Sequence, residues 1–418
     1  MHASTLDLLR CPYCGGSLEL VASLFHRVDA DEVRDGILGC RCCTFAVIDG
    51  IPVLHLDGAS TTARAHVEAG RPDLARRAMF NLDDEGDAAR FDEVVSSDLS
   101  TYREVVDALG PAFEGGYFLY RFSDPTYLVA DAVVRSVAGT VLKNGGRAID
   151  VCGGSGHLTR SLLDLTSLPP VLADLHFSKI WLARRFTAPG CEGVCCDGNS
   201  PFPFARGAFA YAMCIDAFMF IWTKRLFVGE MTRLLGAAGA EGGTGAIVIG
   251  HAHNERVWSA SHGQPLTPEG YRELFETVEP RLFAESGLFA DVVKGGPLDL
   301  TRRDSAATLD ADPALTIIAS PNRAVFGRHA LPSPAGVRGE YRLNPLYAAE
   351  PRGDRLSLRL RFPNDDYEQE YGACRQYLPA EAVVERAALD ALAEGRLSPE
   401  LADLARRRVI LDLPKRYY

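Results

Sequence analysis

The stretch Arg147-Ala148-Ile149-Asp150-Val151-Cys152-Gly153-Gly154-Ser155-Gly156-His157-Leu158-Thr159 decides the fold of this chain. A β-branched and apolar run passes directly into clustered glycines and then into an apolar-periodic segment, which predicts a strand, a tight turn and a helix. Glycines let the backbone turn sharply and let a ligand approach the main chain, and the following helix offers unpaired N–H groups. The stretch therefore predicts a binding loop for a nucleotide-like cofactor.

The turn has the pattern Asp-x-Cys-x-Gly-x-Gly, formed by Asp150, Cys152, Gly154 and Gly156. It resembles the (D/E)-x-G-x-G-x-G loop of class I S-adenosylmethionine (SAM)-dependent methyltransferases. The resemblance implies a Rossmann-like α/β sheet, SAM as cofactor, and a carboxylate at Asp150 that helps to hold the methionine part. Cys152 stands where the family usually has glycine, so the backbone there must accommodate a small Cβ. An ordinary glycine-rich turn is the alternative.

Later segments match the same family over roughly residues 117 to 320. Val171–Asp174 is a second short strand ending in an acid, a place where doubly wound sheets can bind ribose hydroxyls. Gly193–Asp197 resembles the third strand, whose aspartate faces the adenine amino group in the family. The apolar run Phe209–Ile221, the strand Ala246–Gly250 and the last strand Leu315–Ala319 predict buried neighbours in the same sheet. The resemblance implies cofactor contacts from Asp150, Cys152, Gly153, Gly154, Gly156, Asp174, Leu175, Asp197, Gly198, Asp216 and Arg121.

The loop after the predicted strand Ala246–Gly250 carries His251 and His253, two candidate catalytic residues. Loops at the carboxyl ends of parallel strands border the ligand crevice, and a histidine is a sensible base for an acceptor hydroxyl or amine. Two alternatives stay open: the rings hydrogen-bond the loop backbone, or they form a His-x-His metal site, for which no acidic partner lies nearby in sequence. We expect substrate contacts from Tyr117, Tyr120, Asn254, Trp258 and His262.

Near the N-terminus, Cys11-Pro12-Tyr13-Cys14 is followed by Cys40-Arg41-Cys42-Cys43. Two C-x-x-C knuckles complete a tetrahedral, closed zinc site, and a small segment that builds little core gains folding free energy from such a structural metal. The spacing predicts Zn²⁺ bound by Cys11, Cys14, Cys40 and Cys43, with Cys42 as a bystander. The alternative is two pairs of reduced surface thiols.

The residues around the knuckles carry a second resemblance. Leu38–Cys40 and Phe45–Leu54, with the turn Asp49-Gly50-Ile51-Pro52, resemble the zinc-ribbon activator proteins that dock onto RNA and protein methyltransferases. Similar ribbons occur fused to bacterial methyltransferases. The resemblance implies a structural or docking module.

The expected organisation has four parts. They are a zinc ribbon over 1–57, a linker and helical segment over 58–116, a class I methyltransferase domain over 117–322 and a C-terminal α+β extension over 323–418. Residues 58–77 are small and polar with no sustained apolar period and predict the linker. Within the helical segment, Thr101 and Glu104 predict a capping box. In the extension, Arg355–Phe362 alternates as a half-exposed strand, while Pro379–Leu392 and Pro399–Arg408 predict two helices.

Composition limits the partners. The 418 residues carry a net charge of −11, and residues 1–57 contain 4 Lys+Arg against 8 Asp+Glu, which argues against nucleic acid as the main partner. No apolar run reaches about 20 residues and the N-terminus lacks a signal-peptide core, so we expect a cytoplasmic protein without membrane contact. A homodimer is possible.

These observations favour a biosynthetic enzyme that transfers the methyl group of SAM to an oxygen or nitrogen of a small molecule, such as a natural-product or sugar intermediate. One alternative is an RNA (rRNA or tRNA) methyltransferase, because the ribbon resembles modules found with such enzymes. Another is a scaffold that binds SAM without turning it over.

Overall fold

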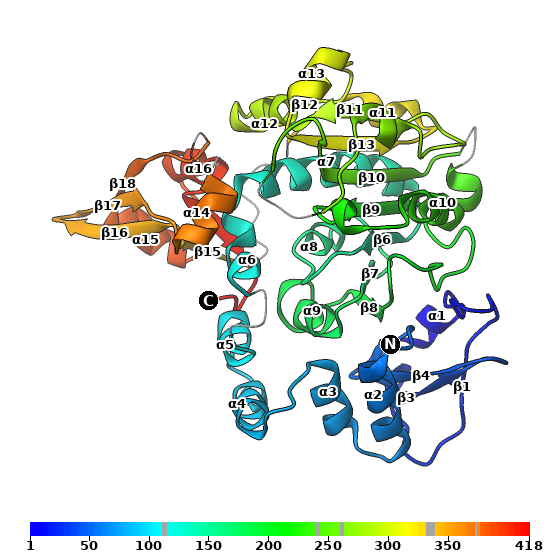
Figure 1. Ribbon diagram of the computed structural model, residues 1–418. Helices are drawn as coiled ribbons and strands as arrows, with labels where there is room; N and C mark the ends of the chain where they lie inside the picture. The colour runs from blue at the N-terminus through cyan, green and yellow to red at the C-terminus, as the bar shows by residue number, and fades with distance from the viewer. Residues whose placement is uncertain (111–114, 240–242, 260–262, 332–338, 373–374, 376) are drawn as a thin grey trace.

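The computed structural model describes residues 1–110, 115–239, 243–259, 263–331, 339–372, 375 and 377–418. A small N-terminal sheet, a helical segment, a central mixed sheet and a C-terminal extension follow one another along the chain (Figure 1). Within the described ranges, no helix is both long enough and apolar enough to cross a membrane.

The N-terminal sheet is antiparallel, with the order β1-β3-β4-β5 and with β2 paired to β3. Its elements are α1 (Ala3–Leu6), β1 (Glu19–Leu20), β2 (Arg27–Asp29), β3 (Glu32–Gly39), β4 (Thr44–Ile48) and β5 (Ile51–Pro52). Asp49 and Gly50, between β4 and β5, have φ angles of 48° and 76°, the left-handed region that tight turns use. Beyond β5, Val53 forms a parallel bridge with Cys195, and the Leu54 N–H donates to the Cys195 carbonyl at 2.7 Å. The N-terminal sheet is therefore joined to the edge of the central sheet.

The segment 58–77, predicted to be a linker, is helical instead. The helices between residues 58 and 108 are α2 (Gly58–Glu68), α3 (Pro72–Met79), α4 (Glu85–Ser96) and α5 (Tyr102–Ala108). A capping box starts α2, because Asp57 accepts the Ser60 N–H at 2.7 Å and donates its own N–H to the Ser60 hydroxyl at 2.8 Å. The buried face of α2 consists of small residues such as Ala63, so its apolar period is weak in the sequence. The capping box predicted at Thr101 and Glu104 is present in α5.

The central sheet has the order β11-β13-β10-β9-β6-β7-β8. Its strands are β6 (Ala148–Val151), β7 (Val171–Asp174), β8 (Glu192–Cys195), β9 (Tyr211–Ile215), β10 (Ala246–His253), β11 (Arg281–Ala284) and β13 (Ala314–Ala319). The strands from β10 to β8 in this order run parallel, and β13 is antiparallel to both β10 and β11. This is the Rossmann-like α/β fold that the sequence predicts.

Helices cover both faces of this sheet. The helices of this part of the chain are α6 (Gly115–Tyr120), α7 (Pro125–Val141), α8 (Thr159–Leu162), α9 (Phe177–Leu182), α10 (Lys224–Leu235), α11 (Pro268–Arg272), α12 (Glu285–Val293) and α13 (Ala306–Ala311). Short 3-10 or π turns are η1 (Arg121–Ser123), η2 (Leu142–Asn144), η3 (Ala183–Thr187), η4 (Phe218–Phe220), η5 (Gly236–Gly239) and η6 (Arg323–Phe326). Alternate residues of β6 enter different cores: Ala148 packs with α7 and α9, and Ile149 packs with α10 and the N-terminal sheet. Both faces of the parallel strands are thus buried, as the continuous apolar runs predict.

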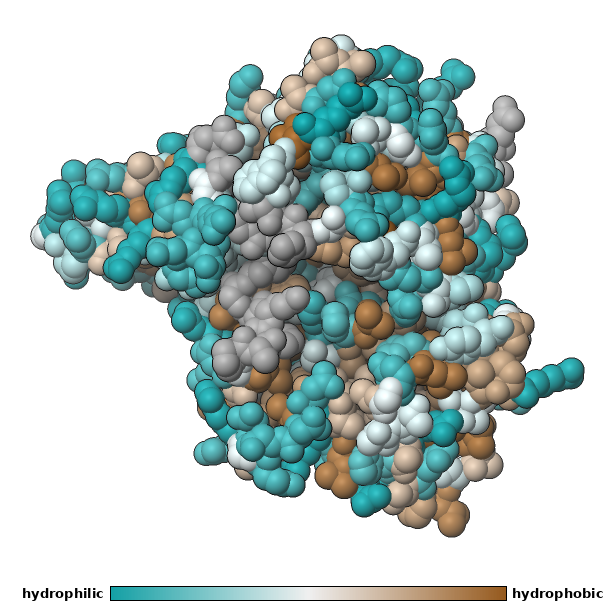
Figure 2. All heavy atoms as spheres, in the orientation of Figure 1, coloured by the Kyte–Doolittle hydropathy of each residue, from teal (hydrophilic) through white to brown (hydrophobic). Residues whose placement is uncertain are grey.

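The C-terminal extension has a core of its own and projects from the molecule at the left of Figure 1. Two short strands, β12 (Leu298–Asp299) and β14 (Arg328–His329), pair with each other before this core. The elements that follow are β15 (Glu340–Leu343), β16 (Tyr347–Arg352), β17 (Arg355–Leu360), α14 (Asp365–Tyr371), β18 (Glu381–Glu385), α15 (Arg386–Ala393), α16 (Pro399–Arg406) and β19 (Ile410–Leu413). The strand predicted over 355–362 is present as β17. The helix predicted over 379–392 is wrong in its first part, because Glu381–Glu385 pairs with β17 as β18. Figure 2 shows a mostly hydrophilic surface on the projecting part.

Candidate functional site

The glycine loop leaves the carboxyl end of β6 with three left-handed residues. The φ angles are 60° at Cys152, 55° at Gly154 and 73° at Gly156. A side chain at Gly153 would place its Cβ 2.4 Å from Leu172, and one at Gly156 would lie 2.8 Å from Ala183. These glycines are therefore required by close packing as well as by conformation, while the Cβ of Cys152 is accommodated although its backbone is in a strained region.

Asp150 lies beneath this loop and is buried. Its Oδ2 accepts the Thr159 hydroxyl at 2.6 Å, which ties the strand to the start of α8. Burial raises the pKa of Asp150 to about 7, and the nearby charge of Asp174 adds to the shift. The carboxylate thus supports the loop from inside the fold.

The acids at the ends of β7 and β8 also accept hydrogen bonds from backbone N–H groups. Asp174 Oδ2 accepts the Gly154 N–H and Asp174 Oδ1 accepts the His176 N–H, both at 2.9 Å. Asp197 Oδ1 accepts the Asn199 N–H at 2.8 Å. The predicted ribose-binding and adenine-facing acids thus lie at the same edge of the sheet as the glycine loop, since β6, β7 and β8 are parallel neighbours.

Other predicted cofactor residues surround this edge. Leu175 follows Asp174 and is partly exposed, with 43% of its surface accessible. A Cβ at Gly198 would lie 3.2 Å from the sulfur of Cys152, so these two positions face each other. Phe118 of α6 covers the loop, because its ring lies 3.1 Å from where a Gly154 Cβ would be. A cofactor that enters here would contact α6.

A second group of side chains gathers at the ends of β9 and β10. Asp216, His251 and His253 each offer one ligand atom, and these atoms lie within 4.8 Å of one another. Asp216 and His251 have left-handed φ angles of 58° and 52°, and the Asp216 N–H donates to the Gly250 carbonyl at 3.0 Å. The pairing of β10 with β13 is irregular between Ile249 and Ala252. The sequence shows no acidic partner close to the two histidines, whereas the fold supplies Asp216.

Glu285, at the start of α12, fixes one of the two rings. Its Oε2 accepts from His251 Nδ1 and its Oε1 accepts the His251 backbone N–H, both at 2.7 Å. The Thr316 hydroxyl also donates to Oε1, at 2.8 Å. Sequence reasoning missed Glu285, because nothing in its local pattern distinguishes it from an ordinary acid in the first turn of a helix.

The two histidines have opposite electrostatic environments. Burial favours the neutral ring of His251, but the negative charges of Glu285 and Asp216 outweigh it and raise the pKa of His251 to about 9. Burial and the neighbouring charge of His251 lower the pKa of His253 to about 4. At neutral pH, His251 is therefore a cation paired with Glu285, and His253 is neutral.

Arg121 joins this group from η1. Its guanidinium lies 3.5 Å from Asp216 Oδ2 and donates to Thr126 Oγ1 at 3.0 Å. Arg121 is buried, so its charge acts in a poorly solvated place. Its predicted contact with the cofactor remains a prediction.

The predicted substrate residues that the structure describes differ in their surroundings. Asn254 is fully buried, and its Nδ2 donates to the carbonyls of Leu309 at 2.9 Å, Asp310 at 3.2 Å and Asp312 at 2.9 Å, so it anchors a loop. Its donor group is occupied by these carbonyls, and its assignment to substrate stays a prediction. Trp258 is exposed over 83% of its surface, and Tyr120 packs against Tyr367 at a ring distance of 5.4 Å. His262 and the side chain of Tyr117 lie outside the described residues.

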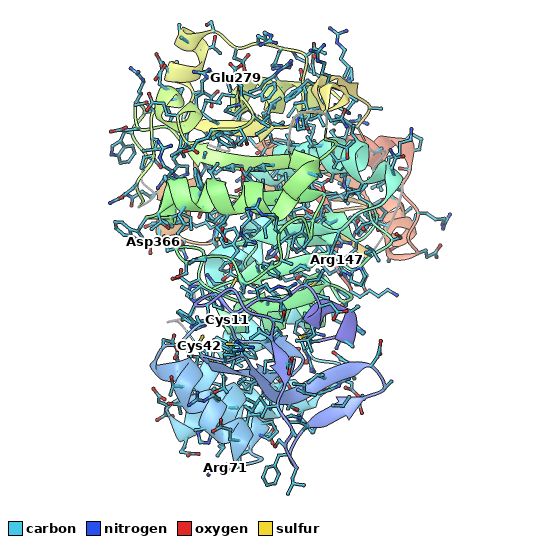
Figure 3. All side chains as sticks on the ribbon, turned by 90° about the vertical axis from the view of Figure 1, so that its right-hand side faces the viewer. Cys11, Cys42, Arg71, Arg147, Glu279 and Asp366 are labelled. Atoms are coloured by element: carbon cyan, nitrogen blue, oxygen red, sulfur yellow. The ribbon has the colours of Figure 1, made fainter. Side chains whose placement is uncertain are left out.

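The cysteines of the N-terminal sheet form a separate cluster. Sulfur–sulfur distances are 3.7 Å for Cys14 and Cys40, 3.5 Å for Cys40 and Cys42, and 3.6 Å for Cys11 and Cys42. Four thiolates at about 2.3 Å from a zinc ion would lie roughly 3.8 Å apart, so this group could hold such an ion. Figure 3 shows Cys11 and Cys42 close together where the N-terminal sheet meets the central sheet.

Cys42, rather than the predicted Cys43, completes this cluster. The Cys42 N–H and the Cys43 N–H both donate to the Cys40 sulfur at 3.4 Å, as in a knuckle. The group whose sulfur atoms all lie within 4.8 Å of one another contains Cys42 and not Cys43, although the Cys43 sulfur lies 3.3 Å from that of Cys42. Spacing along the chain identified the knuckle, but the direction of each side chain depends on the packing of β4.

A surface hollow of about 640 Å³ lies between α3, α4 and α9. Its lining includes Arg71, Arg77, Trp181 and Arg185. None of the predicted site residues lines it.

Comparison with known proteins gives matches in solved structures alone. No protein-family model matches the chain, and no curated protein matches it. The complex that contains the Haloferax volcanii Trm112 methyltransferase activator includes a chain with 14% identity and a TM-score of 0.31, covering 47% of this chain and 94% of its own. Geranyl diphosphate C-methyltransferase from Streptomyces coelicolor has 13% identity and a TM-score of 0.31, covering 42% of this chain and 71% of its own. A geranyl diphosphate methyltransferase solved with SAM has 13% identity and a TM-score of 0.35, covering 53% of this chain and 96% of its own. The fold is therefore assigned from the strand order above.

Proposed function

We propose that this chain is a SAM-dependent methyltransferase that transfers a methyl group to an oxygen or nitrogen atom of a small molecule. The observation that carries the proposal is the placement of Asp150, Asp174 and Asp197 around the glycine loop, on consecutive strands of a doubly wound sheet. The crevice outside the carboxyl ends of such strands is where this class of sheet binds its ligands.

SAM would supply the electrophilic methyl group when bound. Asp174 is the side chain that we assign to the ribose hydroxyls, since each of its oxygens has one backbone donor and retains further acceptor capacity. Asp197 and Gly198 would border the adenine, and Arg121 the methionine carboxylate. Phe118 would exclude water from the glycine loop, because it already covers Gly154.

The acceptor would lie against Asp216, His251 and His253. Glu285 holds Nδ1 of His251, so that ring is a fixed donor. Among the hydrogen bonds of the described residues, the His253 ring has no such carboxylate partner, and its Nδ1 lies 3.5 Å from the Ser259 hydroxyl. In the simplest form of the reaction, the proton of the acceptor passes to His253 as the methyl group is transferred. The chain's net charge of −11 favours a small molecule over a nucleic acid.

The N-terminal sheet would be a zinc ribbon that supports this domain. Its cysteine cluster can hold an ion, and the sheet is joined to β8 through Val53 and Leu54. A structural ion here would stabilise a segment with little core of its own.

The first test is a thermal shift with SAM and with its demethylated product, compared with NAD as a control. SAM at 100 times its Kd should stabilise the protein by about 2.7 kcal/mol and raise its melting temperature.

Asp174→Ala should weaken SAM binding by one to two decades, about 1.5–3 kcal/mol, because a charge-assisted hydrogen bond is lost. Asp174→Asn, which can still accept the Gly154 N–H, separates support of the loop from ribose binding.

A shift with NAD and none with SAM would contradict the proposal. If SAM binds Asp174→Ala as tightly as wild type, the ribose assignment is wrong, and SAM binds in another pose.

A further inference from the structure

We propose that Asp216, His251 and His253 form a binding site for a divalent transition-metal ion. The group combines two imidazoles and one carboxylate from adjacent parallel strands, β9 and β10. Such a set occupies one face of an ion and leaves other positions open. The site is distinct from the cysteine cluster, which offers thiolates alone.

The geometry is close to that of a bound ion. The ligand atoms lie within 4.8 Å of one another. Ligands on one face of an ion, each about 2.0–2.2 Å from it, lie roughly 3.0–3.5 Å apart, so the side chains must close by no more than about 2 Å to hold an ion. The two rings are already at a centroid distance of 5.4 Å with an interplanar angle of 80°, which lets their nitrogens converge without a clash between the rings.

Glu285 is an independent sign of a ligand site. Histidines that bind metals almost always donate their second ring N–H to a carboxylate or carbonyl, which fixes the tautomer and the ring orientation. Here Nδ1 of His251 lies 2.7 Å from Glu285 Oε2, and Glu285 is itself held by Thr316. This leaves Nε2 of His251 as the atom available to an ion.

The ligands select the class of metal. Imidazole nitrogens favour ions such as Zn²⁺, Fe²⁺, Co²⁺ or Ni²⁺, whereas Ca²⁺ and Mg²⁺ prefer sites made of oxygen. An ion here would share Asp216 with the guanidinium of Arg121, 3.5 Å away, and would displace the proton from His251. The nearby positive charge makes this a site of moderate affinity.

The inference deepens the proposed function, because an ion at this edge would take an oxygen of the acceptor in an open position. A coordinated hydroxyl is more acidic than a free one, so the ion would replace His253 as the means of removing the proton. Binding of the ion does not itself depend on methyl transfer.

The experiment is a titration of the purified, zinc-containing protein with Co²⁺, followed by calorimetry and visible absorption. We expect one Co²⁺ per chain, with the weak bands of a nitrogen and oxygen site and without a sulfur-to-cobalt charge-transfer band. Zinc should remain on the cysteines, since it binds more tightly than cobalt. Asp216→Asn and His253→Gln should abolish binding, and Glu285→Gln should weaken it by about 10–100-fold.

His329→Gln is the matched control, because that ring bonds the Val325 carbonyl far along the chain from the site. It should bind Co²⁺ like wild type, and so should Cys14→Ser at this site. Unchanged binding in folded Asp216→Asn and His253→Gln proteins would overturn the inference, as would a bound cobalt whose spectrum shows thiolate ligands. A failure of SAM to bind would leave this result unaffected, so the two proposals fail separately.

Discussion

At the scale of single residues, tertiary environment decides what each histidine and carboxylate does. His251 and His253 are two positions apart, yet their pKa values move in opposite directions, to about 9 and about 4. Glu285 makes the difference, because it lies against one ring and not the other. His157, in the glycine loop, is a third case: it is fully enclosed and its pKa is lowered to about 3 by burial and by nearby arginines.

His157 should make the stability of the protein depend on pH. Its Nε2 lies 2.8 Å from the Tyr417 hydroxyl, and because that hydroxyl donates to the Phe118 carbonyl, the ring must donate to the tyrosine. An unfolded chain protonates this histidine near pH 6.5, whereas the folded chain does so near pH 3. The unfolded state thus binds more protons between these values, and stability falls as the pH falls, by at most about 1.4 kcal/mol per pH unit.

The measurement is urea unfolding of wild type and His157→Gln from pH 7.5 to 4.5. The difference between the two proteins isolates His157 from Asp150, whose raised pKa acts in the opposite direction over part of this range. Wild type should lose stability relative to the variant as the pH decreases. A difference that stays constant with pH would show that folding does not shift the pKa of His157.

At the scale of elements, the second cysteine knuckle shows how a turn and a strand together determine a ligand set. Chain spacing favours Cys43, because it completes a C-x-x-C pattern. The structure directs the Cys42 sulfur toward Cys11 and Cys40, whereas the Cys43 sulfur lies outside the group of sulfurs that are all within 4.8 Å of one another.

We therefore expect Cys42→Ser to lose the zinc and Cys43→Ser to retain it. Loss of the ion should also destabilise the N-terminal sheet, because zinc binding in small modules is part of the folding free energy. Elemental analysis of the purified variants measures the first effect, and limited proteolysis of residues 1–57 measures the second. Cys191→Ser, a buried cysteine outside the cluster, serves as the control for metal content. Zinc lost from Cys43→Ser and kept in Cys42→Ser would restore the assignment made from spacing.

At the scale of the whole molecule, Tyr417 ties the C-terminal extension to the central domain. Tyr417 stacks on Tyr102 at a ring distance of 4.7 Å and meets Phe122 at 5.1 Å. Its hydroxyl donates to the Phe118 carbonyl at 2.7 Å, so the end of the chain supports α6 beside the glycine loop. The extension is thereby tied to the central domain although it has a core of its own.

Tyr417→Ala should lower the free energy of unfolding by about 3–5 kcal/mol, the usual cost of removing a large buried aromatic ring. Tyr417→Phe should cost about 1–3 kcal/mol, because it keeps the ring but leaves buried polar partners unpaired. Urea unfolding followed by tryptophan fluorescence measures both. Leu99→Ala, at a position that is 83% exposed, should change stability by no more than about 0.5 kcal/mol. Equal stability of Tyr417→Ala and wild type would show that the C-terminus is not part of the fold's core.

Short-range sequence patterns were sufficient to predict the elements at the edge of the sheet where we propose that SAM binds. The glycine loop after β6, the acid at the end of β7 and the buried run of β9 each depend on neighbours within a few residues, which the sequence displays directly. Helix α2 was not predictable in this way, because its buried face is made of small residues that pack on β4.

Long-range contacts decided the rest of the site. Asp216 meets His251 and His253 because β9 and β10 are parallel neighbours whose carboxyl ends coincide. Glu285 reaches His251 from the start of α12, since β11 and β13 bring that helix to the edge of the sheet. The sequence by itself determined the class of fold and the kinds of chemical groups at its edge. Tertiary structure alone decided which groups meet, because partners far apart along the chain leave no periodic signal.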